Sequence, residues 1–201
     1  MKISEGIKHV GRPFEIPDCD RRDLPRFFKE MGYKVGAEIG VFRGEFTKRF
    51  CQEGLKMYAI DPWIWYDDYV ENSYQAKLDK SYALATERLK DYDCEIIRKF
   101  SMDAVKDFDN DSLDFVYIDG NHGFKHVTED IYEWSKKVRK GGVISGHDYT
   151  YLVGDKLFHC DVKWVVDAYT KAIKKSWFVL GRKETLPNEK RDRHRSFMWF
   201  K

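Results

Sequence analysis

Carboxylates and imidazoles gather in two short segments, residues 119–122 (DGNH) and 146–149 (GHDY). Each segment follows an apolar run typical of a buried strand. Because neighbouring parallel strands end at the same edge of a sheet, we expect these side chains to lie within a few ångströms of one another. Hard divalent cations prefer carboxylate oxygens, and an imidazole favours manganese over calcium, so the candidate metal ligands are Asp119, His147 and Asp148. Capping of a helix or turn is the alternative role for the two aspartates.

His122, three residues after Asp119, is the candidate general base. An alcohol that attacks an electrophile must lose its proton, and a histidine titrates in the range that suits this task. A bound cation would orient the hydroxyl and lower its pKa, which gives Asp119 a share in catalysis. The rival bases are three further histidines, His126, His147 and His159.

Residues 35–50 have the pattern of a short apolar strand, a glycine turn and the start of an amphipathic helix. Glycine at positions 40 and 44 lets the backbone turn sharply and approach a bound molecule closely. A helix that begins at Gly44 would direct free N–H groups toward the same place. We interpret the stretch as a ligand-binding loop, with an ordinary tight turn between strand and helix as the alternative.

A second predicted strand, residues 56–60, ends in Asp61. An acidic residue at this place in a doubly wound sheet hydrogen-bonds the hydroxyls of a ribose. The dinucleotide form of the site needs Gly-x-Gly-x-x-Gly to hold a pyrophosphate. This chain instead has Glu38 before its first glycine and lacks the third glycine at that spacing. The pattern therefore disfavours a nicotinamide oxidoreductase and suits a cofactor without a pyrophosphate.

At residues 38–44 and at Asp61 the chain resembles the class I S-adenosylmethionine-dependent methyltransferases. The first motif of that family has this form, and its second motif is an acidic residue. The resemblance implies an enzyme that uses S-adenosylmethionine, held by Glu38, Gly40, Gly44 and Asp61.

Two further segments would border this cofactor. In the resembled family the residues just after the third strand line the adenine, which implies cofactor contacts for Ser101 and Met102. Helix capping is the alternative for Ser101. The aromatic segment 62–69 leaves the carboxyl end of the second strand, beside the expected crevice. We predict that Trp63 contacts the cofactor and that the segment forms a lid or a substrate wall, with packing onto the next helix as the alternative.

The two polar segments look like those of the metal-assisted sugar O-methyltransferases of the macrocin and mycinamicin type. Those enzymes hold the metal with an aspartate after the fourth strand and an acidic pair after the fifth. In some members a histidine three residues after the first aspartate is the base. The resemblance implies Mn²⁺ or Mg²⁺ as a second cofactor and His122 as the base. His147 departs from the pattern, since family members commonly carry Asp or Glu at its position.

The order of the predicted elements indicates an α/β fold. Strands alternate with helices through most of the chain, which requires parallel strands. The last two strand-like runs, 177–180 and 196–200, are joined like a hairpin and must be antiparallel to each other. We predict a Rossmann-like, doubly wound, mixed sheet of seven strands with one antiparallel strand near the C-terminus. Residues 1–34 would form an N-terminal extension with a covering helix over 21–31, and residues 35–201 the methyltransferase domain.

Two local predictions concern the second half of the chain. A helix over 124–139 should end at the glycine pair 141–142, and the fifth strand should occupy 142–145. The basic segment 182–195 has the charge of a nucleic-acid patch. Because Glu184, Glu189 and Asp192 lie between its cations, we interpret it as the solvated tip of a hairpin.

Lys and Arg number 36 and Asp and Glu 34, which gives a net charge of +2. No global field therefore favours nucleic acid or an anionic membrane, and we expect neither as a partner. The four cysteines form no Cys-x-x-Cys pair, and the N-terminal residues lack the apolar core of a signal peptide. We expect reduced thiols, no membrane-spanning segment and a cytoplasmic protein.

Together these patterns predict an S-adenosylmethionine-dependent O-methyltransferase that acts on a sugar hydroxyl, such as that of rhamnose or another deoxyhexose in a glycan or glycoside. The first rival is the same chemistry on a catechol-like phenol or another small-molecule hydroxyl. The second is an inert cofactor-fold module within a larger glycan-modifying protein, although a module without chemistry has no use for the His/Asp cluster. A homo-oligomer is compatible with each of these.

Overall fold

The computed structural model describes residues 1–67, 74–150, 160–181, 192 and 194–201. The strands of the described residues are β1 (Phe14–Ile16), β2 (Val35–Ile39), β3 (Lys56–Ile60), β4 (Cys94–Ile97), β5 (Leu113–Ile118), β6 (Val138–Gly146), β7 (Phe178–Leu180) and β8 (Ser196–Phe200). The α-helices are α1 (Ile3–Gly6), α2 (Leu24–Glu30), α3 (Glu45–Gln52), α4 (Gln75–Leu89), α5 (Ser101–Ala104), α6 (Phe124–Lys137) and α7 (Val162–Ile173). Two 3₁₀ turns are η1 (Arg21–Asp23) and η2 (Val105–Asp107).

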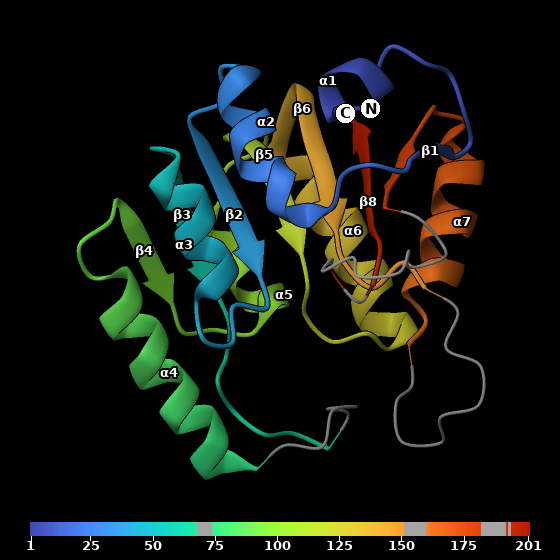
Figure 1. Cartoon of the computed structure of the whole chain (residues 1–201). Helices are drawn as coiled ribbons and strands as arrows, with labels where there is room; N and C mark the ends of the chain where they lie inside the picture. Colours follow the sequence, from blue (N-terminus) through green and yellow to red (C-terminus); the bar gives the residue numbers. More distant parts are fainter. Residues whose placement is uncertain (68–73, 151–159, 182–191, 193) are drawn as a thin grey trace, which may run out of the picture.

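All these strands form one sheet, in the order β1-β7-β8-β6-β5-β2-β3-β4. β8 runs antiparallel to its neighbours β6 and β7, and the other pairs are parallel. Figure 1 shows α2 and α3 in front of the sheet and α6 behind it, which is the arrangement of a doubly wound fold. The predicted fold class, with one reversed strand near the C-terminus, is confirmed.

β1 was not predicted from the sequence. It pairs in parallel with β7, with Phe14 opposite Phe178, and so extends the predicted seven strands to eight in the described residues. Pro13 and Pro17 flank it, and proline suits an edge strand because it has no N–H for an inner ladder. Three residues are too few to show an alternating pattern. The N-terminal segment therefore contributes a strand to the sheet as well as a covering helix.

The predicted boundary between α6 and β6 was wrong. α6 ends at Lys137, and the chain passes directly into β6 at Val138, before the two glycines that were expected to end the helix. Gly141 has a φ of 77°, and a Cβ on Gly142 would lie 2.3 Å from the carbonyl oxygen of Asp114 in β5. The glycines therefore let β6 turn and approach β5 closely.

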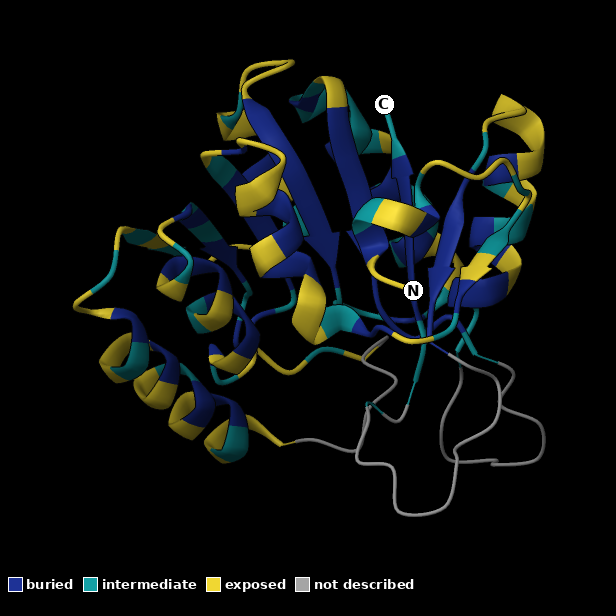
Figure 2. Cartoon of the chain, turned by 45° about the horizontal axis from the view of Figure 1, so that its top comes forward, coloured by how far each residue is buried: buried dark blue, intermediate teal, exposed yellow. Residues whose placement is uncertain are grey.

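β5 is the centre of the core and is buried along its whole length. On one face, the ring centroids of Phe115 and Phe28 lie 4.5 Å apart, as do those of Tyr117 and Phe46, which joins β5 to α2 and α3. On the other face, β5 belongs to a buried cluster with α6 and α7. Figure 2 shows the central strands buried between helices whose outer faces are exposed. This packing fixes the place where β5 ends and its polar residues begin.

Two bulk predictions concern the described residues directly. No helix among them is long and apolar enough to cross a membrane. The cysteines are free thiols, in agreement with the prediction that no disulfide scaffold holds the fold.

A buried carboxylate in β5 ties the sheet to the segment before β2. Asp114 Oδ2 accepts hydrogen bonds from the N–H groups of Lys34 (2.6 Å) and Val35 (2.9 Å), and Oδ1 accepts one from Arg139 Nε (2.6 Å). Burial alone would raise the pKa of Asp114, but these bonds outweigh it and hold the pKa below its usual value. Because the folded pKa is depressed, the carboxylate stabilises the fold above about pH 4, and this stabilisation is lost as the pH falls through the folded pKa.

Asp114→Asn should therefore lower the free energy of unfolding at pH 7 by about 1–3 kcal/mol, because buried N–H groups lose a charged acceptor. Urea unfolding at a series of pH values measures this, and the difference from wild type should shrink as the pH falls. Asp111→Asn is the control: Asp111 is exposed and pairs with Lys201, so its loss should cost less than about 0.5 kcal/mol. A difference for Asp114→Asn that stays constant down to low pH would contradict the electrostatic explanation.

Candidate active site

The loop between β2 and α3 is shaped by neighbouring segments of the chain. Gly40 has a φ of 89°, and a Cβ there would lie 2.2 Å from the carbonyl oxygen of Asp119, just after β5. Gly44, directly before α3, has a φ of 71°, and a Cβ there would lie 3.0 Å from the side chain of Leu89 in α4. From the sequence, both glycines were predicted to make room for a bound molecule. In the structure, positive φ values and the protein's own neighbouring atoms already require glycine.

Asp61, directly after β3, holds the same loop. Its Oδ2 accepts hydrogen bonds from the N–H groups of Val41 (3.0 Å) and Phe42 (2.9 Å), and its Oδ1 accepts one from the N–H of Trp63 (2.8 Å). Trp63 is fully buried, and its indole N–H donates to the carbonyl of Phe42 at 2.7 Å. Asp61 and Trp63 therefore stabilise the glycine loop from the β3 side.

Two other predicted cofactor residues are anchored to helices. Glu38 in β2 is 2% exposed and accepts a hydrogen bond from the Thr47 hydroxyl of α3, and burial raises the pKa of Glu38 well above its ordinary value. Ser101 begins α5 but does not cap it, because the N-cap is Phe100. The Ser101 hydroxyl instead donates to Asp130 of α6. The capping alternative for Ser101 is therefore not observed.

One cavity of about 560 Å³ joins these residues to the polar ends of β5 and β6. This volume is in the range of small-molecule sites. The predicted cofactor residues along the cavity are Glu38, Gly40, Asp61, Trp63, Ser101 and Met102. The predicted catalytic and metal-binding residues along it are Asp119, His122, His147 and Asp148. Gly44 is the predicted site residue that does not line it, because it packs against α4.

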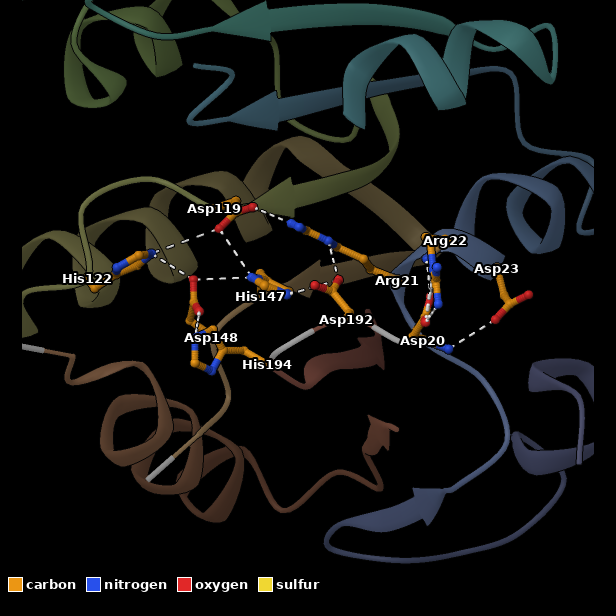
Figure 3. A network of polar contacts seen from close by, with 10 residues as sticks. All are labelled: Asp20, Arg21, Arg22, Asp23, Asp119, His122, His147, Asp148, Asp192 and His194. Carbon is orange, nitrogen blue, oxygen red and sulfur yellow. Dashed lines mark hydrogen bonds and ion pairs between the residues drawn. The ribbon is translucent and has the colours of Figure 1, made fainter. Parts of the chain in front are cut away.

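The two polar segments meet as predicted (Figure 3). His122 Nε2 lies 3.0 Å from Asp148 Oδ2 and 3.9 Å from Asp119 Oδ1. His147 Nδ1 lies 3.2 Å from Asp148 Oδ2 and 3.7 Å from Asp119 Oδ1. Ligand atoms of Asp119, His122 and Asp148 all lie within 4.8 Å of one another, close enough to hold one cation. The geometry therefore offers His122, as well as the predicted His147, as the nitrogen ligand.

The cluster is buried, and its charges stabilise one another: His122, His147 and Asp148 are 5%, 6% and 5% exposed. Burial lowers the pKa of His122, but hydrogen bonds to Asp119 and Asp148 outweigh it and raise the pKa well above its ordinary value. For His147, burial is outweighed by the charge of Asp119 and by bonds to Asp148 and Asp192, which raise its pKa to about 10. Burial raises the pKa of Asp148, but bonds to both imidazoles outweigh it and lower the pKa. The carboxylates thus favour added positive charge, which protons or a divalent cation supply.

Arg21 and Asp192 belong to the same network, although neither was predicted (Figure 3). Arg21 Nη1, in η1, donates to Asp119 Oδ2 at 2.9 Å, and Arg21 Nε pairs with Asp192. Asp192 Oδ2 also lies 3.2 Å from His147 Nε2. Segments from both ends of the chain therefore complete the cluster.

The interpretation of segment 182–195 as a solvated hairpin tip is wrong for Asp192, whose side chain is 13% exposed. His194 also faces the site, with Nε2 3.9 Å from Asp148 Oδ1. Residues 182–191 and 193 lie outside the described part of the chain. An acidic residue among cations was visible in the sequence, but no local pattern connects it to β6.

The described part of the aromatic segment borders the cavity with Pro62, Trp63, Ile64 and Tyr66. The Tyr66 hydroxyl accepts a hydrogen bond from Asn121 Nδ2 at 3.0 Å. Residues 68 and 69 of this segment lie outside the described residues, as does the rival base His159. The rival base His126 lies beside the Tyr66 ring, with ring centroids 6.1 Å apart.

A family model described as a methyltransferase domain matches residues 37–149, which is more than half of the chain. The protein belongs to this methyltransferase family. The match begins within β2 and ends three residues after β6, and it therefore includes the glycine loop, Asp61 and the polar segments after β5 and β6. A comparison with curated protein sequences gave no match.

Solved structures of methyltransferases share the fold of this domain. An O-methyltransferase from Bacillus cereus, in complex with SAH, superposes with a TM-score of 0.62 at 16% identity, covering 90% of this chain and 80% of that one. The O-methyltransferase TomG from Streptomyces achromogenes, in complex with SAM, gives 0.60 at 13% identity, with 90% and 78% covered. An rRNA methylase from Streptococcus thermophilus gives 0.55 at 14% identity, with 89% and 93% covered. At these identities the likeness is one of fold.

Proposed function

We propose that the protein is an S-adenosylmethionine-dependent O-methyltransferase that acts on a sugar hydroxyl with the help of a divalent cation. The observation that carries this proposal is a cavity that extends from the glycine loop to the buried His/Asp cluster. A methyl donor beside the loop and a hydroxyl beside the cluster would share this cavity, and transfer requires them to be held in line. Membership of the methyltransferase family and the fold shared with an O-methyltransferase solved with SAH support the choice of cofactor.

The cofactor, when bound, supplies a methyl group on a positively charged sulfur. In the proposal, Asp61 takes the ribose hydroxyls, since it follows β3 and borders the cavity. Ser101 and Met102 contact the adenine. Gly40 and Glu38 border the cofactor where the cavity approaches Asp119.

The donor set fits a hard divalent cation, Mn²⁺ or Mg²⁺, because it combines two carboxylates with an imidazole in a buried place. Asp119, Asp148 and His147 would hold the ion. We favour His147 over His122 as the nitrogen ligand because its Nε2 lies 3.2 Å from Asp192 Oδ2, and a metal-binding histidine usually donates its second N–H to a carboxylate, a backbone carbonyl or water, which orients the ring. The bound cation would supply Lewis acidity toward a hydroxyl.

His122 is the general base in this proposal. Its Nε2 lies 3.0 Å from Asp148 Oδ2, so the carboxylate orients the imidazole and stabilises the cation that forms when it accepts a hydroxyl proton. Asp119 and Asp148 raise the pKa of this imidazole while they carry their full negative charge, and a cation held by the same carboxylates would offset that charge and leave the imidazole neutral, as a base must be. Arg21 Nη1 donates to Asp119 Oδ2 and so holds the carboxylate whose other oxygen, Oδ1, faces the two histidines.

The cavity wall supports a sugar as the acceptor. The rings of Tyr66 and Phe100 meet edge to face, with centroids 5.4 Å apart, and both line the cavity together with the polar side chains of Asn121 and His194. A sugar ring has an apolar face for such rings and several hydroxyls for polar groups. A catechol-like phenol also offers oxygens to a cation and is the rival acceptor. Transfer of a labelled methyl group to rhamnosides and to catechols, assayed in parallel, tests the proposal. If the catechol became labelled and the rhamnoside did not, the assignment of a sugar acceptor would be contradicted.

Metal removal gives a second test. EDTA should lower methyl transfer at least about 100-fold, and added Mn²⁺ should restore it, because a cation contributes several kcal/mol to such a step. Calorimetric titration of Mn²⁺ should show a loss of affinity of at least about tenfold for His147→Ala and less than about threefold for His122→Ala. The reverse pattern would make His122 the ligand and His147 the base. Full turnover in EDTA would contradict the role of the metal.

A further inference from the structure

A second pocket, of about 520 Å³, is formed by η1, α3, the last turn of α4 and Asp192. Among the described residues, the side chains that line it include five cations and two carboxylates. The cations of this basic pocket are Arg21, Arg22, Lys48, Arg49 and Arg88. The whole chain has a net charge of only +2, so the concentration of positive charge is local to the pocket. The proposed function has so far given no role to this pocket.

The two carboxylates of the basic pocket are already paired with its own arginines. Asp192 pairs with Arg21 Nε, and a Glu45 carboxylate oxygen lies 3.4 Å from Arg88 Nη2. Because each of these carboxylates has an arginine partner, neither is available to neutralise the other cations of the pocket. The remaining cations repel one another, and a bound anion would relieve this repulsion.

Lys48 and Arg49, at consecutive positions of α3, form no ion pair with a carboxylate in the described part of the chain. Arg49 is exposed, and the Lys48 nitrogen lies 5.9 Å from the centre of the Tyr92 ring, which does not neutralise its charge. A guanidinium binds phosphate oxygens in pairs, and an ammonium adds a compact positive charge. A carboxylate carries one negative charge, whereas a phosphate ester carries about two. The two uncompensated cations therefore match a phosphate better than a carboxylate.

Arg21 connects the basic pocket to the His/Asp cluster. Its Nη1 donates to Asp119 Oδ2 at 2.9 Å. Arg21, Glu45 and Phe46 line both the basic pocket and the cavity of the candidate active site. Figure 3 shows Arg22 beyond Arg21, on the side away from the cluster. A molecule held at the cluster can therefore extend past Arg21 into the basic pocket.

We propose that the basic pocket binds a phosphate or diphosphate ester carried by the acceptor sugar. This inference rests on the proposed function and adds the class of acceptor, a phosphorylated sugar in place of a neutral glycoside. The reacting hydroxyl would face the cluster, and the phosphate would lie against Lys48 and Arg49. Binding energy from a group remote from the reacting atoms holds the hydroxyl in position. A sugar 1-phosphate and a nucleoside diphosphate sugar share this chemistry.

Steady-state methyl transfer to methyl rhamnoside, rhamnose 1-phosphate and thymidine diphosphate rhamnose tests this inference. Free Mn²⁺ is held constant, because phosphates chelate it. For the wild type, kcat/KM should be at least about tenfold higher for a phosphorylated acceptor than for methyl rhamnoside. In the double variant Lys48→Gln/Arg49→Gln this preference should fall at least about tenfold, mainly through a higher KM. A preference for the 1-phosphate identifies a monoester as the ligand, and a preference for the nucleotide identifies a diphosphate.

Arg26→Gln is the matched control. Arg26 lies on α2, its side chain is 78% exposed, and it pairs with Glu30 without lining the basic pocket. This variant should keep the preference of the wild type. A wild type that methylates methyl rhamnoside as efficiently as both phosphorylated acceptors would overturn this inference alone, as would a double variant that keeps the full preference.

Calorimetric titration of inorganic pyrophosphate into metal-free protein separates the basic pocket from the chemistry. The wild type and Arg26→Gln should bind pyrophosphate equally well, and Lys48→Gln/Arg49→Gln at least about tenfold more weakly. Equal affinity in the double variant would contradict the role of these two cations. Pyrophosphate binding by a wild type that transfers methyl groups to none of the three sugars would overturn the proposed function, and the acceptor assigned here with it.

Discussion

His122→Ala should lower methyl transfer by about 10²- to 10⁴-fold, which is the usual contribution of a general base. His122 Nε2 lies 3.0 Å from Asp148 Oδ2 and 3.9 Å from Asp119 Oδ1, beside the carboxylates that would hold the cation and, through it, the reacting hydroxyl. Because the cofactor is assigned to the other residues along the cavity, the affinity for S-adenosylhomocysteine should change less than about threefold. Single-turnover transfer and calorimetry on the same preparation measure the two quantities.

His9→Ala is the control for the histidine substitution, because His9 stacks on Phe14 next to β1 and does not line the cavity. It should keep both activity and affinity. His126→Ala tests the rival base, whose ring lies beside Tyr66. If His126→Ala lost turnover while His122→Ala kept it, the general base would be His126. Loss of cofactor binding in His122→Ala would contradict the assignment of His122 as the base.

Asp61→Ala should have the opposite effect and weaken S-adenosylhomocysteine binding at least about 100-fold. The part-buried N–H groups of Val41 and Trp63 and the exposed N–H of Phe42 lose their acceptor, and a buried group left unsatisfied costs about 1–3 kcal/mol. The glycine loop should therefore lose its conformation, and the ribose should lose its partner. Turnover at saturating cofactor should fall much less, because the His/Asp cluster is left intact.

Asp91→Ala is the matched control for Asp61→Ala: it removes an exposed aspartate after α4 and should leave the cofactor affinity unchanged. Unaltered affinity in Asp61→Ala would show that the loop keeps its shape without the carboxylate. Together, Asp61→Ala and His122→Ala separate cofactor binding from chemistry. If these residues had only a structural role, the two variants would not affect binding and turnover separately.

Much of the fold could be predicted because β5 and its neighbours carry strong local patterns. β2, β3, β5 and β8 begin and end where the apolar runs do. The strand ends bring Asp119 and Asp148 together, because parallel neighbours terminate at one edge of the sheet. The residue type at each strand end was therefore enough to predict the cluster.

The rest of the site depends on contacts that no local pattern encodes. Arg21 reaches Asp119 across 98 positions of the sequence, and Asp192 reaches both Arg21 and His147 from the segment before β8. Their charges looked like those of solvated surface residues, since charge alone does not show what a side chain faces. Asp130 was missed for a related reason: it lies on the helical face that packs inward, where an isolated acidic residue gives no periodic signal.

The glycines show a different limit. Gly40 was identified correctly as a special position, but its closest neighbour is the carbonyl of Asp119. Gly141 and Gly142 were expected to end α6, whereas they let β6 pass close to β5. A glycine in a sequence marks a need for space or for a positive φ, and only the three-dimensional neighbours show which segment imposes it.

The most direct test of the account is calorimetric titration of S-adenosylhomocysteine into the wild-type protein, alone, with EDTA and with added Mn²⁺. We predict binding of one molecule per chain in all three conditions, since the residues assigned to the cofactor are separate from those assigned to the metal. Absence of binding in all three would contradict the methyltransferase account, because a cavity that does not accept the cofactor product cannot hold the methyl donor.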